Sequence, residues 1–258
     1  MTKDAGALLK RGYVEGVCSF CGALGRFEGA LRLARQEFAC PACKATLRYR
    51  DQAAAILSQF AHGCETSLDS FVQSEDCRRL SVYEAAIRGP FVRRFRKLPR
   101  YTQSYFFEDL PLGEARQGVV CQDLERLTFA DESFDLIVTS DVMEHVARPK
   151  AAIAEIARVL KPAGAHVFSI PIRFPIAKNS VERARIVDGR IEHLLEPRYH
   201  RSGEDEPSLV FTDFGCDLLD WHRSVGMRAR FFNSHRLIES SYYFPTVIAV
   251  KAPGDAIH

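Results

Sequence analysis

Four cysteines near the start of the chain have the spacing of a metal site. Cys18 and Cys21 form one C-x2-C pair, and Cys40 and Cys43 form a second pair eighteen residues later. Each pair presents two sulfurs about one tight turn apart, so the two pairs together complete a tetrahedron suited to zinc. Four thiolates leave no position for water or substrate, so the predicted zinc is structural. We therefore predict a zinc ribbon over residues 1–50, with reduced cysteines that only pack as the alternative.

The predicted ribbon also carries basic side chains that could contact the phosphates of a nucleic acid. These are Arg26, Arg32, Arg35, Lys44, Arg48 and Arg50. Solubility alone would explain them as well, because runs of charge are usually solvated surface. A protein or nucleic-acid partner at the ribbon is therefore one interpretation, and a plain solvated face is the other.

Three short apolar segments in the middle of the chain predict buried strands at Gly118–Cys121, Phe134–Thr139 and Ala165–Ile170. Between the last two, Pro149–Leu160 has apolar residues at helical spacing. Lys161–Gly164 then predicts the end of this helix and a turn. A strand, a helix and a further strand make a right-handed βαβ unit, whose parallel sheet is covered on both faces.

Several motifs in and around this unit occur in a characteristic order. They are Asp123-Leu124, Leu127-Thr128-Phe129, Ser133-Phe134-Asp135-Leu136-Ile137, Val142-Met143-Glu144-His145-Val146 and Arg158-Val159-Leu160-Lys161-Pro162-Ala163-Gly164. The stretch resembles the central half of a class I S-adenosylmethionine-dependent methyltransferase of the type 11 kind. The resemblance implies an α/β fold with a Rossmann-like, seven-stranded, mostly parallel sheet and an antiparallel last strand. The whole chain also resembles methyltransferase-domain proteins that begin with a zinc ribbon and have a degenerate glycine-rich motif.

The same resemblance implies a cofactor loop after the first strand, which we place at Leu80–Glu84. Glu84 matches the acidic position of the family at that point. The family's glycine-rich turn is replaced by Ala85-Ala86-Ile87-Arg88-Gly89, in which only Gly89 is left. Alanine adds a Cβ where the backbone should pass close to a ligand. Either S-adenosylmethionine sits differently here, or the site has lost it.

Four more residues are implied to contact the cofactor. Asp123 and Leu124 match the family positions that meet the adenine ring, although an aspartate there could also cap a helix. Tyr105 lies in the predicted second strand, Tyr101–Phe107, and could stack on or border the adenosine, or be an ordinary strand aromatic. Ser140 follows the fourth strand, at the carboxyl edge where open parallel sheets bind ligands.

Three histidines are the candidate catalytic residues. His145 lies close to Ser140 and could act as a base on an acceptor hydroxyl or amine, although the family also uses it to anchor the next helix. His193 and His200 lie in residues 172–212, a charged segment that we predict to be a long loop inserted after the sheet strands. Such a loop is either a lid that contacts substrate or an exposed flexible segment.

Composition limits the remaining choices. The chain has 258 residues, 47% hydrophobic and 26% charged, with a net charge of +2, as expected of an ordinary globular protein. No apolar run resembles a leader peptide or a membrane span, so we expect a cytoplasmic protein without membrane insertion. We expect a ribbon at residues 1–50, linker helices at 51–79, and a methyltransferase-like domain at 80–258.

The first functional hypothesis is an enzyme that transfers a methyl group from S-adenosylmethionine. Such a transfer depends on in-line positioning and needs no dedicated base. We expect a small or glycan-like acceptor in preference to a nucleic acid. The alternative is an inactive binding protein that recognises a partner through its ribbon, and a nucleic-acid methyltransferase guided by the ribbon is a third hypothesis.

Overall fold

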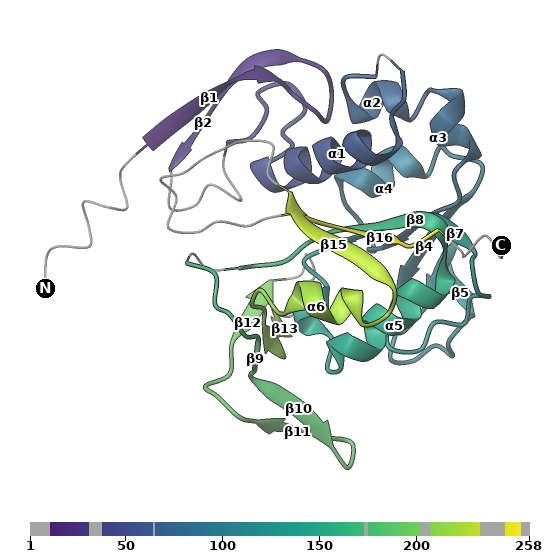
Figure 1. Ribbon diagram of the computed structural model, residues 1–258, viewed down its shortest axis with the longest axis vertical. Coiled ribbons are helices and arrows are strands. Elements are labelled where there is room, and N and C mark those ends of the chain that lie inside the picture. Colours follow the sequence, from purple (N-terminus) through teal and green to yellow (C-terminus); the bar gives the residue numbers. More distant parts are fainter. Residues whose placement is uncertain are drawn as a thin grey trace, which may run out of the picture.

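An eight-stranded sheet forms the centre of the molecule (Figure 1). The computed structural model describes residues 11–30, 38–63, 65–172, 175–201, 207–232 and 246–253. The strands run in the order β15-β16-β8-β7-β3-β4-β6-β5 across the sheet. Their bounds are β3 (Val82–Ala85), β4 (Tyr101–Tyr105), β5 (Ala115–Arg116), β6 (Val119–Cys121), β7 (Phe134–Ser140), β8 (Leu160–Ser169), β15 (Met227–Phe232) and β16 (Thr246–Lys251).

The sheet is mostly parallel. Strands β6, β4, β3, β7 and β8 pair in parallel, and β16 runs antiparallel to both β8 and β15. The chain passes outward from β3 to β4 and β6, and then returns to the other side of β3 to form β7 and β8. This is a Rossmann-like topology, as predicted, with an antiparallel last strand. The sheet has eight strands and not seven, because the two-residue strand β5 pairs antiparallel with β6 at the edge.

Helices cover both faces of the sheet (Figure 1). One side holds α1 (Leu47–Phe60), α2 (Leu68–Phe71), α3 (Glu75–Arg79) and α4 (Pro90–Phe95), and the other holds α5 (Pro149–Val159) and α6 (Leu218–Arg223). Successive strand residues point to opposite faces. Val138 and Val167 accordingly join the core on the α1 side, whereas Ile137 and Phe168 join the core on the α5 side. Among the described helices, none is long and apolar enough to cross a membrane.

Helix α1 begins earlier than its sequence suggested. We expected a helix over Asp51–Phe60 with Asp51 at its N-cap, but α1 starts at Leu47 and its N-cap is Thr46. Asp51 is only 4% exposed and lies inside the helix. The chain therefore passes from the second cysteine pair into α1 almost without a linker.

The N-terminal hairpin and the sheet share one core. Cys18, Phe20 and Phe27 belong to the same buried cluster as residues of α1 and as Val82 and Val138 of the sheet. Helix α1 packs against β8 and β16. The division at residues 50 and 79 stays a prediction, and packing is continuous across both points.

The predicted turn at Lys161–Gly164 is a bulge within β8. Ala163 has a positive φ of 62°, and the register between β7 and β8 shifts between Phe134 and Leu136. A Cβ on Gly164 would lie 2.9 Å from the carbonyl oxygen of Lys161 and 3.1 Å from that of Asp135. Only glycine fits this close approach. The helix does end where the sequence predicted, at Val159.

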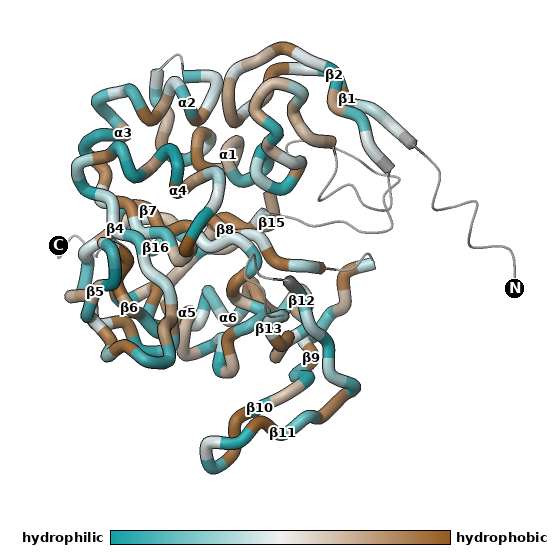
Figure 2. Tube along the Cα trace, turned by 180° about the vertical axis from the view of Figure 1, so that it is seen from behind, coloured by the Kyte–Doolittle hydropathy of each residue, from teal (hydrophilic) through white to brown (hydrophobic). Residues whose placement is uncertain are grey.

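Residues 172–212 were predicted to be a long loop, and this was wrong. The segment forms short strands that pair β10 with β11, β12 with β13 and β9 with β14. Their bounds are β9 (Val181–Glu182), β10 (Ala184–Val187), β11 (Arg190–His193), β12 (Tyr199–Arg201), β13 (Pro207–Leu209) and β14 (Thr212–Asp213). The β10–β11 hairpin projects from the body, and apolar residues along it are visible in Figure 2. Two of them, Ile186 and Ile191, are exposed.

Candidate active site and cysteine cluster

The four cysteines of the two C-x2-C pairs meet in one cluster. Their sulfurs lie within 4.8 Å of one another. The Sγ atoms of Cys18 and Cys43 are 3.9 Å apart, and those of Cys21 and Cys40 are 3.7 Å apart. Zinc–sulfur bonds of about 2.3 Å in a tetrahedron would place the sulfurs about 3.8 Å apart. The donor set and its spacing therefore fit a zinc ion.

The two pairs sit in turns with the same hydrogen bonds. The first lies between β1 (Arg11–Val17) and β2 (Leu24–Ala30), where the amide of Cys18 donates to the carbonyl of Ala23 and that of Gly22 donates to Cys18. The second repeats this pattern, with Cys40 donating to Ala45 and Lys44 donating to Cys40. Gly22 and Lys44 occupy equivalent positions with φ of 81° and 63°. The sequence thus builds the same turn twice, once with glycine and once with lysine.

A cleft of about 1770 Å³ lies at the carboxyl ends of the parallel strands. A pocket for one drug-sized ligand is about 300–1,000 Å³, so this cleft has room for a cofactor and an acceptor together. It is lined by eight of the predicted site residues: Glu84, Gly89, Tyr105, Asp123, Leu124, Ser140, His145 and His200. The ninth, His193, is exposed on β11 and is not part of the lining.

Glu84 is buried at the end of β3, only 2% exposed. Its carboxylate accepts a hydrogen bond from the Tyr101 hydroxyl at 2.8 Å and another from the backbone amide of Val92, in the first turn of α4. Burial nevertheless raises the pKa of Glu84 to about 8, because desolvation outweighs both hydrogen bonds. Glu84 thus links β3, β4 and α4 at the edge of the cleft.

The loop that replaces the glycine-rich turn is held by Gln103. The side-chain amide of Gln103 donates to the carbonyls of Ala86 and Ile87, at 2.7 and 2.8 Å. Gly89 has an extended backbone, and a Cβ added there would meet nothing within 4 Å. The loop therefore has a defined shape without its glycines, and it leaves open space beside Gly89.

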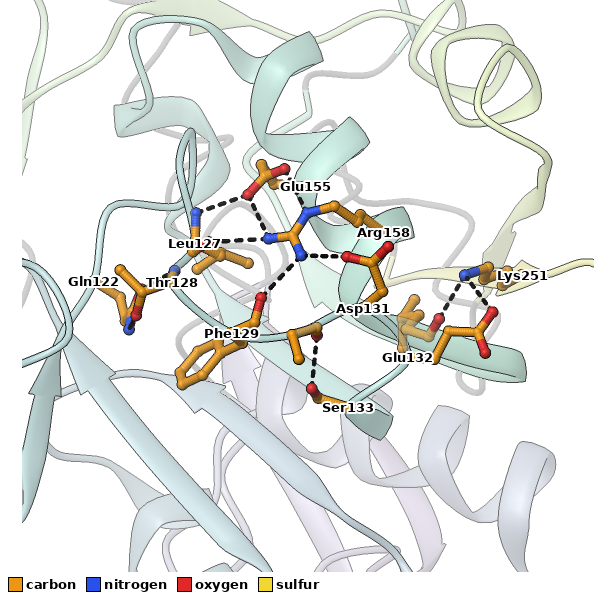
Figure 3. A network of polar contacts seen from close by, with 12 residues as sticks. Gln122, Leu127, Thr128, Phe129, Asp131, Glu132, Ser133, Glu155, Arg158 and Lys251 are labelled. Carbon is orange, nitrogen blue, oxygen red and sulfur yellow. Dashed lines mark hydrogen bonds and ion pairs between the residues drawn. The ribbon is translucent and has the colours of Figure 1, made fainter.

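Asp123 lies in a loop that α5 holds in place. The Asp123 carboxylate accepts from the amide of Glu125 at 2.9 Å. Downstream, the Arg158 guanidinium of α5 donates to the carbonyls of Leu127 and Phe129 and pairs with Glu155 (Figure 3). Arg158 also contacts Asp131, and the Glu155 carboxylate accepts from the amide of Leu127. Arg158, the first residue of the Arg158–Gly164 motif, therefore anchors the loop that carries Asp123 and Leu124.

Aromatic residues form one wall of the cleft next to this loop. Tyr105 and Phe107 pack edge to face with ring centroids 5.1 Å apart. Phe106 is 52% exposed, although it lies at the cleft. An exposed aromatic wall suits a flat heterocycle such as adenine.

Two side chains of α1 contact the end of β7 beside the cleft, which only Arg48 lines, and sequence reasoning missed both contacts. The Ser140 hydroxyl donates to the Gln52 side chain at 2.8 Å, and Gln52 donates to the Thr139 carbonyl at 3.1 Å. Arg48 forms an ion pair with Asp141, whose φ is positive at 56°. Arg48 was grouped with the arginines that could contact phosphates, but its side chain is directed to this carboxylate and is largely buried. No local pattern connects α1 with the end of β7.

His145 and His200 come together at the other end of the cleft. His145 lies in the 3-10 turn η3 (Met143–His145), and its Nδ1 is 2.7 Å from the carbonyl oxygen of Leu209. His200 lies in β12, and the centroid of its ring is 5.6 Å from the centroid of the His145 ring. Glu144 lies between them and is fully buried. The structure therefore unites two of the three predicted histidines and leaves His193 outside the cleft.

Comparison with known families identifies the central part of the chain. Residues 105–168 match the family model described as "Methyltransferase domain". The match begins after the Ala85–Gly89 loop and covers the segment from Tyr105 to Phe168. An uncharacterized methyltransferase of Mycolicibacterium gilvum is 33% identical over 109 residues, which are 41% of this chain and 43% of that protein. One of Mycobacterium leprae is 30% identical over 109 residues, or 41% of this chain and 40% of that protein.

The alignment thus spans about two fifths of the length of these curated relatives. Among solved structures, an S-adenosylmethionine-dependent methyltransferase from Mesorhizobium loti is similar with a TM-score of 0.45 and 16% identity, over 67% of this chain and 91% of that chain. A Burkholderia thailandensis N1-methyltransferase, solved with S-adenosylhomocysteine, has a TM-score of 0.43 and 16% identity, over 71% and 76% of the two chains. The match to a methyltransferase domain thus covers residues 105–168, about a quarter of the chain.

Proposed function

We propose that this protein is an enzyme that transfers the methyl group of S-adenosylmethionine to an acceptor bound in the same cleft. One observation carries the proposal: the segment matched as a methyltransferase domain supplies β6, β7 and the loops whose ends border the cleft. In open α/β sheets, ligands bind outside the carboxyl ends of the strands, where the strand order reverses. The reversal here lies at β3, between β4 and β7.

The cleft residues have separate roles in this proposal. Asp123 and Leu124 would meet the adenine, with Tyr105 beside the ring. Glu84 and the backbone beside Gly89 would face the methionine part, and Ser140 would border the reacting end. The bound cofactor supplies an activated methyl group, and the chain contributes orientation and exclusion of water.

We also propose a structural zinc at Cys18, Cys21, Cys40 and Cys43. Four sulfur ligands close the coordination shell, so this ion takes no part in the reaction. Its role would be to hold together the two cysteine turns, the second of which leads directly into α1.

A small or glycan-like acceptor fits the cleft better than a nucleic acid. Of the three arginines that line the cleft, Arg48 pairs with Asp141 and Arg198 with Asp213, which leaves Arg88 as the third. Phosphate recognition needs basic groups that are free to meet the backbone of the nucleic acid. The cleft wall beyond these pairs is largely aromatic and apolar.

Calorimetric titration with S-adenosylmethionine and S-adenosylhomocysteine tests the proposal. We expect micromolar binding by the wild-type chain and at least about tenfold weaker binding by Asp123→Ala, equivalent to about 1.4 kcal/mol. The exposed Asp76→Ala on α3 is the matched control and should bind normally. No binding by a folded wild-type chain at millimolar ligand would refute the proposal and favour a non-catalytic binding protein.

The same titration can locate the methionine end. Because burial keeps the Glu84 carboxyl protonated near neutral pH, a cationic amine bound beside it should lower its pKa and release a proton. Titrations at pH 7 in buffers of different ionisation enthalpy would detect that proton. Equal heats in both buffers would place the amine elsewhere.

A further inference from the structure

The strongest unexplained feature of the cleft is the group formed by Glu144, His145 and His200. Glu144 and His145 lie in η3, directly after β7. His200 comes from β12, in the segment between β8 and β15. A backbone hydrogen bond from the Phe211 amide to the Glu144 carbonyl, 2.7 Å long, fixes that segment against η3. The fold therefore brings together two neighbouring residues and one distant residue.

The ligand atoms of the three residues converge. One oxygen of Glu144, Oε1, lies 3.8 Å from Nε2 of His145 and 3.8 Å from Nδ1 of His200. All three donor atoms lie within 4.8 Å of one another. Distances of 3.8 Å are too long for direct hydrogen bonds. The three atoms surround a point that none of them occupies.

Glu144 carries the second observation. Its side chain is 0% exposed, and within the part of the chain that the structure describes neither carboxylate oxygen has a hydrogen-bond partner. A buried carboxylate without partners is costly, because it has lost its hydration and gained nothing in return. Buried charges in proteins are normally paired or bound to a metal. Glu144 thus indicates a missing positive group.

The orientation of His145 suits a metal ligand. Its Nδ1 lies 2.7 Å from the Leu209 carbonyl oxygen, which can only accept a hydrogen bond, so Nδ1 carries the proton. The lone pair is then on Nε2, the atom nearest to Glu144. Metal-bound histidines characteristically donate their other ring nitrogen to a carbonyl or carboxylate, which fixes the ring.

We propose that Glu144, His145 and His200 bind a divalent transition metal of the zinc or iron(II) class. Two imidazoles and one carboxylate are a ligand set typical of open sites for such metals. Bonds of about 2.0–2.2 Å at tetrahedral angles place donors roughly 3.3–3.6 Å apart, so the two 3.8 Å distances from Glu144 would shorten by a few tenths of an ångström. Since His145 and His200 line the cleft, the open positions face it. If the proposed methyl transfer is correct, these positions would take an oxygen of the acceptor, which makes a hydroxyl or carboxyl compound the expected class.

Cobalt titration of the full chain tests the site. The cysteine cluster is first filled with zinc, which thiolates hold more tightly than cobalt. We expect one further equivalent of Co²⁺, with visible bands of a nitrogen- and oxygen-ligated ion and no sulfur charge-transfer band. His200→Ala and Glu144→Gln should lose this equivalent and keep the zinc. His193→Ala, a histidine of the same segment outside the cluster, should keep both metals.

A variant that gains a spectroscopic band shows that loss of cobalt binding in the other variants does not come from misfolding. His200→Cys keeps a ligand at the same position and should add a sulfur-to-cobalt band while still binding one equivalent. A folded wild-type chain that binds only the zinc would overturn the proposal, as would a second equivalent that survives His200→Ala. Binding of S-adenosylhomocysteine is measured on the same samples to separate this inference from the proposed function. A chain that binds S-adenosylhomocysteine but no second metal ion refutes only the site described here.

Discussion

The cysteine cluster and the Glu144–His200 cluster are two proposed metal sites whose ligands come together in different ways. The four cysteines come from two turns with identical backbone hydrogen bonds, and each turn brings its own pair of sulfurs. Glu144 and His145 depend on a strand from a distant segment to bring His200 to them. The first set is closed by its own four ligands, and the second opens onto the cleft. The difference teaches that local spacing specifies the proposed structural site, whereas the proposed open site is assembled by tertiary structure.

The largest effect should come from breaking the cysteine cluster. Cys40→Ser removes one zinc ligand, and structural zinc contributes about 10 kcal/mol or more to small domains at neutral pH. That exceeds much of the usual stability of a domain, so we expect the N-terminal hairpin to unfold. Zinc content and thermal melting would show it, and Cys216→Ser, at an exposed cysteine, is the control. Unchanged zinc and melting in Cys40→Ser would contradict the proposed site.

Acid should destabilise the fold through histidines outside both clusters. Burial lowers the pKa of His222 to about 4 and also lowers that of His166. These two histidines bind protons in the unfolded chain but stay neutral in the folded chain. The free energy of unfolding therefore decreases as pH falls from about 6.5 towards 4. His222 alone accounts for up to about 3 kcal/mol.

Denaturant unfolding at several pH values measures this loss. His222→Gln should reduce the dependence of the free energy of unfolding on pH between pH 6.5 and 4. An unaltered slope would assign the acid sensitivity to other groups. Tests of either metal cluster are therefore cleanest above pH 6.5, where acid unfolding does not mimic metal loss.

Arg48 connects the two regions, and its removal should affect the cleft more than the hairpin. Arg48→Ala leaves Asp141 without its cationic partner in a largely buried position, at a cost of about 2 kcal/mol. We also expect weaker cofactor binding, because Asp141 and Ser140 share the end of β7. Arg26→Ala breaks an exposed pair with Glu28 and should cost less than about 0.5 kcal/mol. If both variants behave alike in unfolding and in cofactor titration, Arg48 has no special role.

The smallest effect concerns the difference between the two cysteine turns. Lys44 adopts a left-handed backbone that costs non-glycine residues about 1 kcal/mol, whereas the equivalent Gly22 adopts it freely. Lys44→Gly should therefore change stability little or raise it slightly, by about 0.5 kcal/mol, after the entropy of the unfolded glycine is counted. Gly22→Ala should lower it by about 1 kcal/mol. The melting temperatures of the zinc-loaded Lys44→Gly and Gly22→Ala variants test both expectations. The same change in melting temperature in both variants would contradict the equivalence of the two turns.

Local patterns predicted most of the sheet but only part of the site. Short, nearly continuous apolar runs and the α5 periodicity predicted the βαβ unit, because parallel strands are buried on both faces and such a helix on one. The early start of α1 at Leu47 was not visible, since its N-cap makes no side-chain hydrogen bond. The paired strands of residues 172–212 were also missed, although Asp188-Gly189, both at positive φ between β10 and β11, is a pair typical of β-hairpin turns. Arg48, Gln52 and Glu144 acquire their roles only through contacts between distant segments.

Helix α1 also bears on how the protein can be divided. It starts within two residues of Ala45, covers β8 and β16 on one side, and holds the end of β7 through Arg48 and Gln52. A gene fragment that encodes only residues 80–258 would leave that apolar side of the sheet bare, and the product would be expected to aggregate. The cysteine turns are thus joined to the methyltransferase-like half through a shared layer of the fold. Recombination that exchanged them for another module would have to replace a layer of the fold as well.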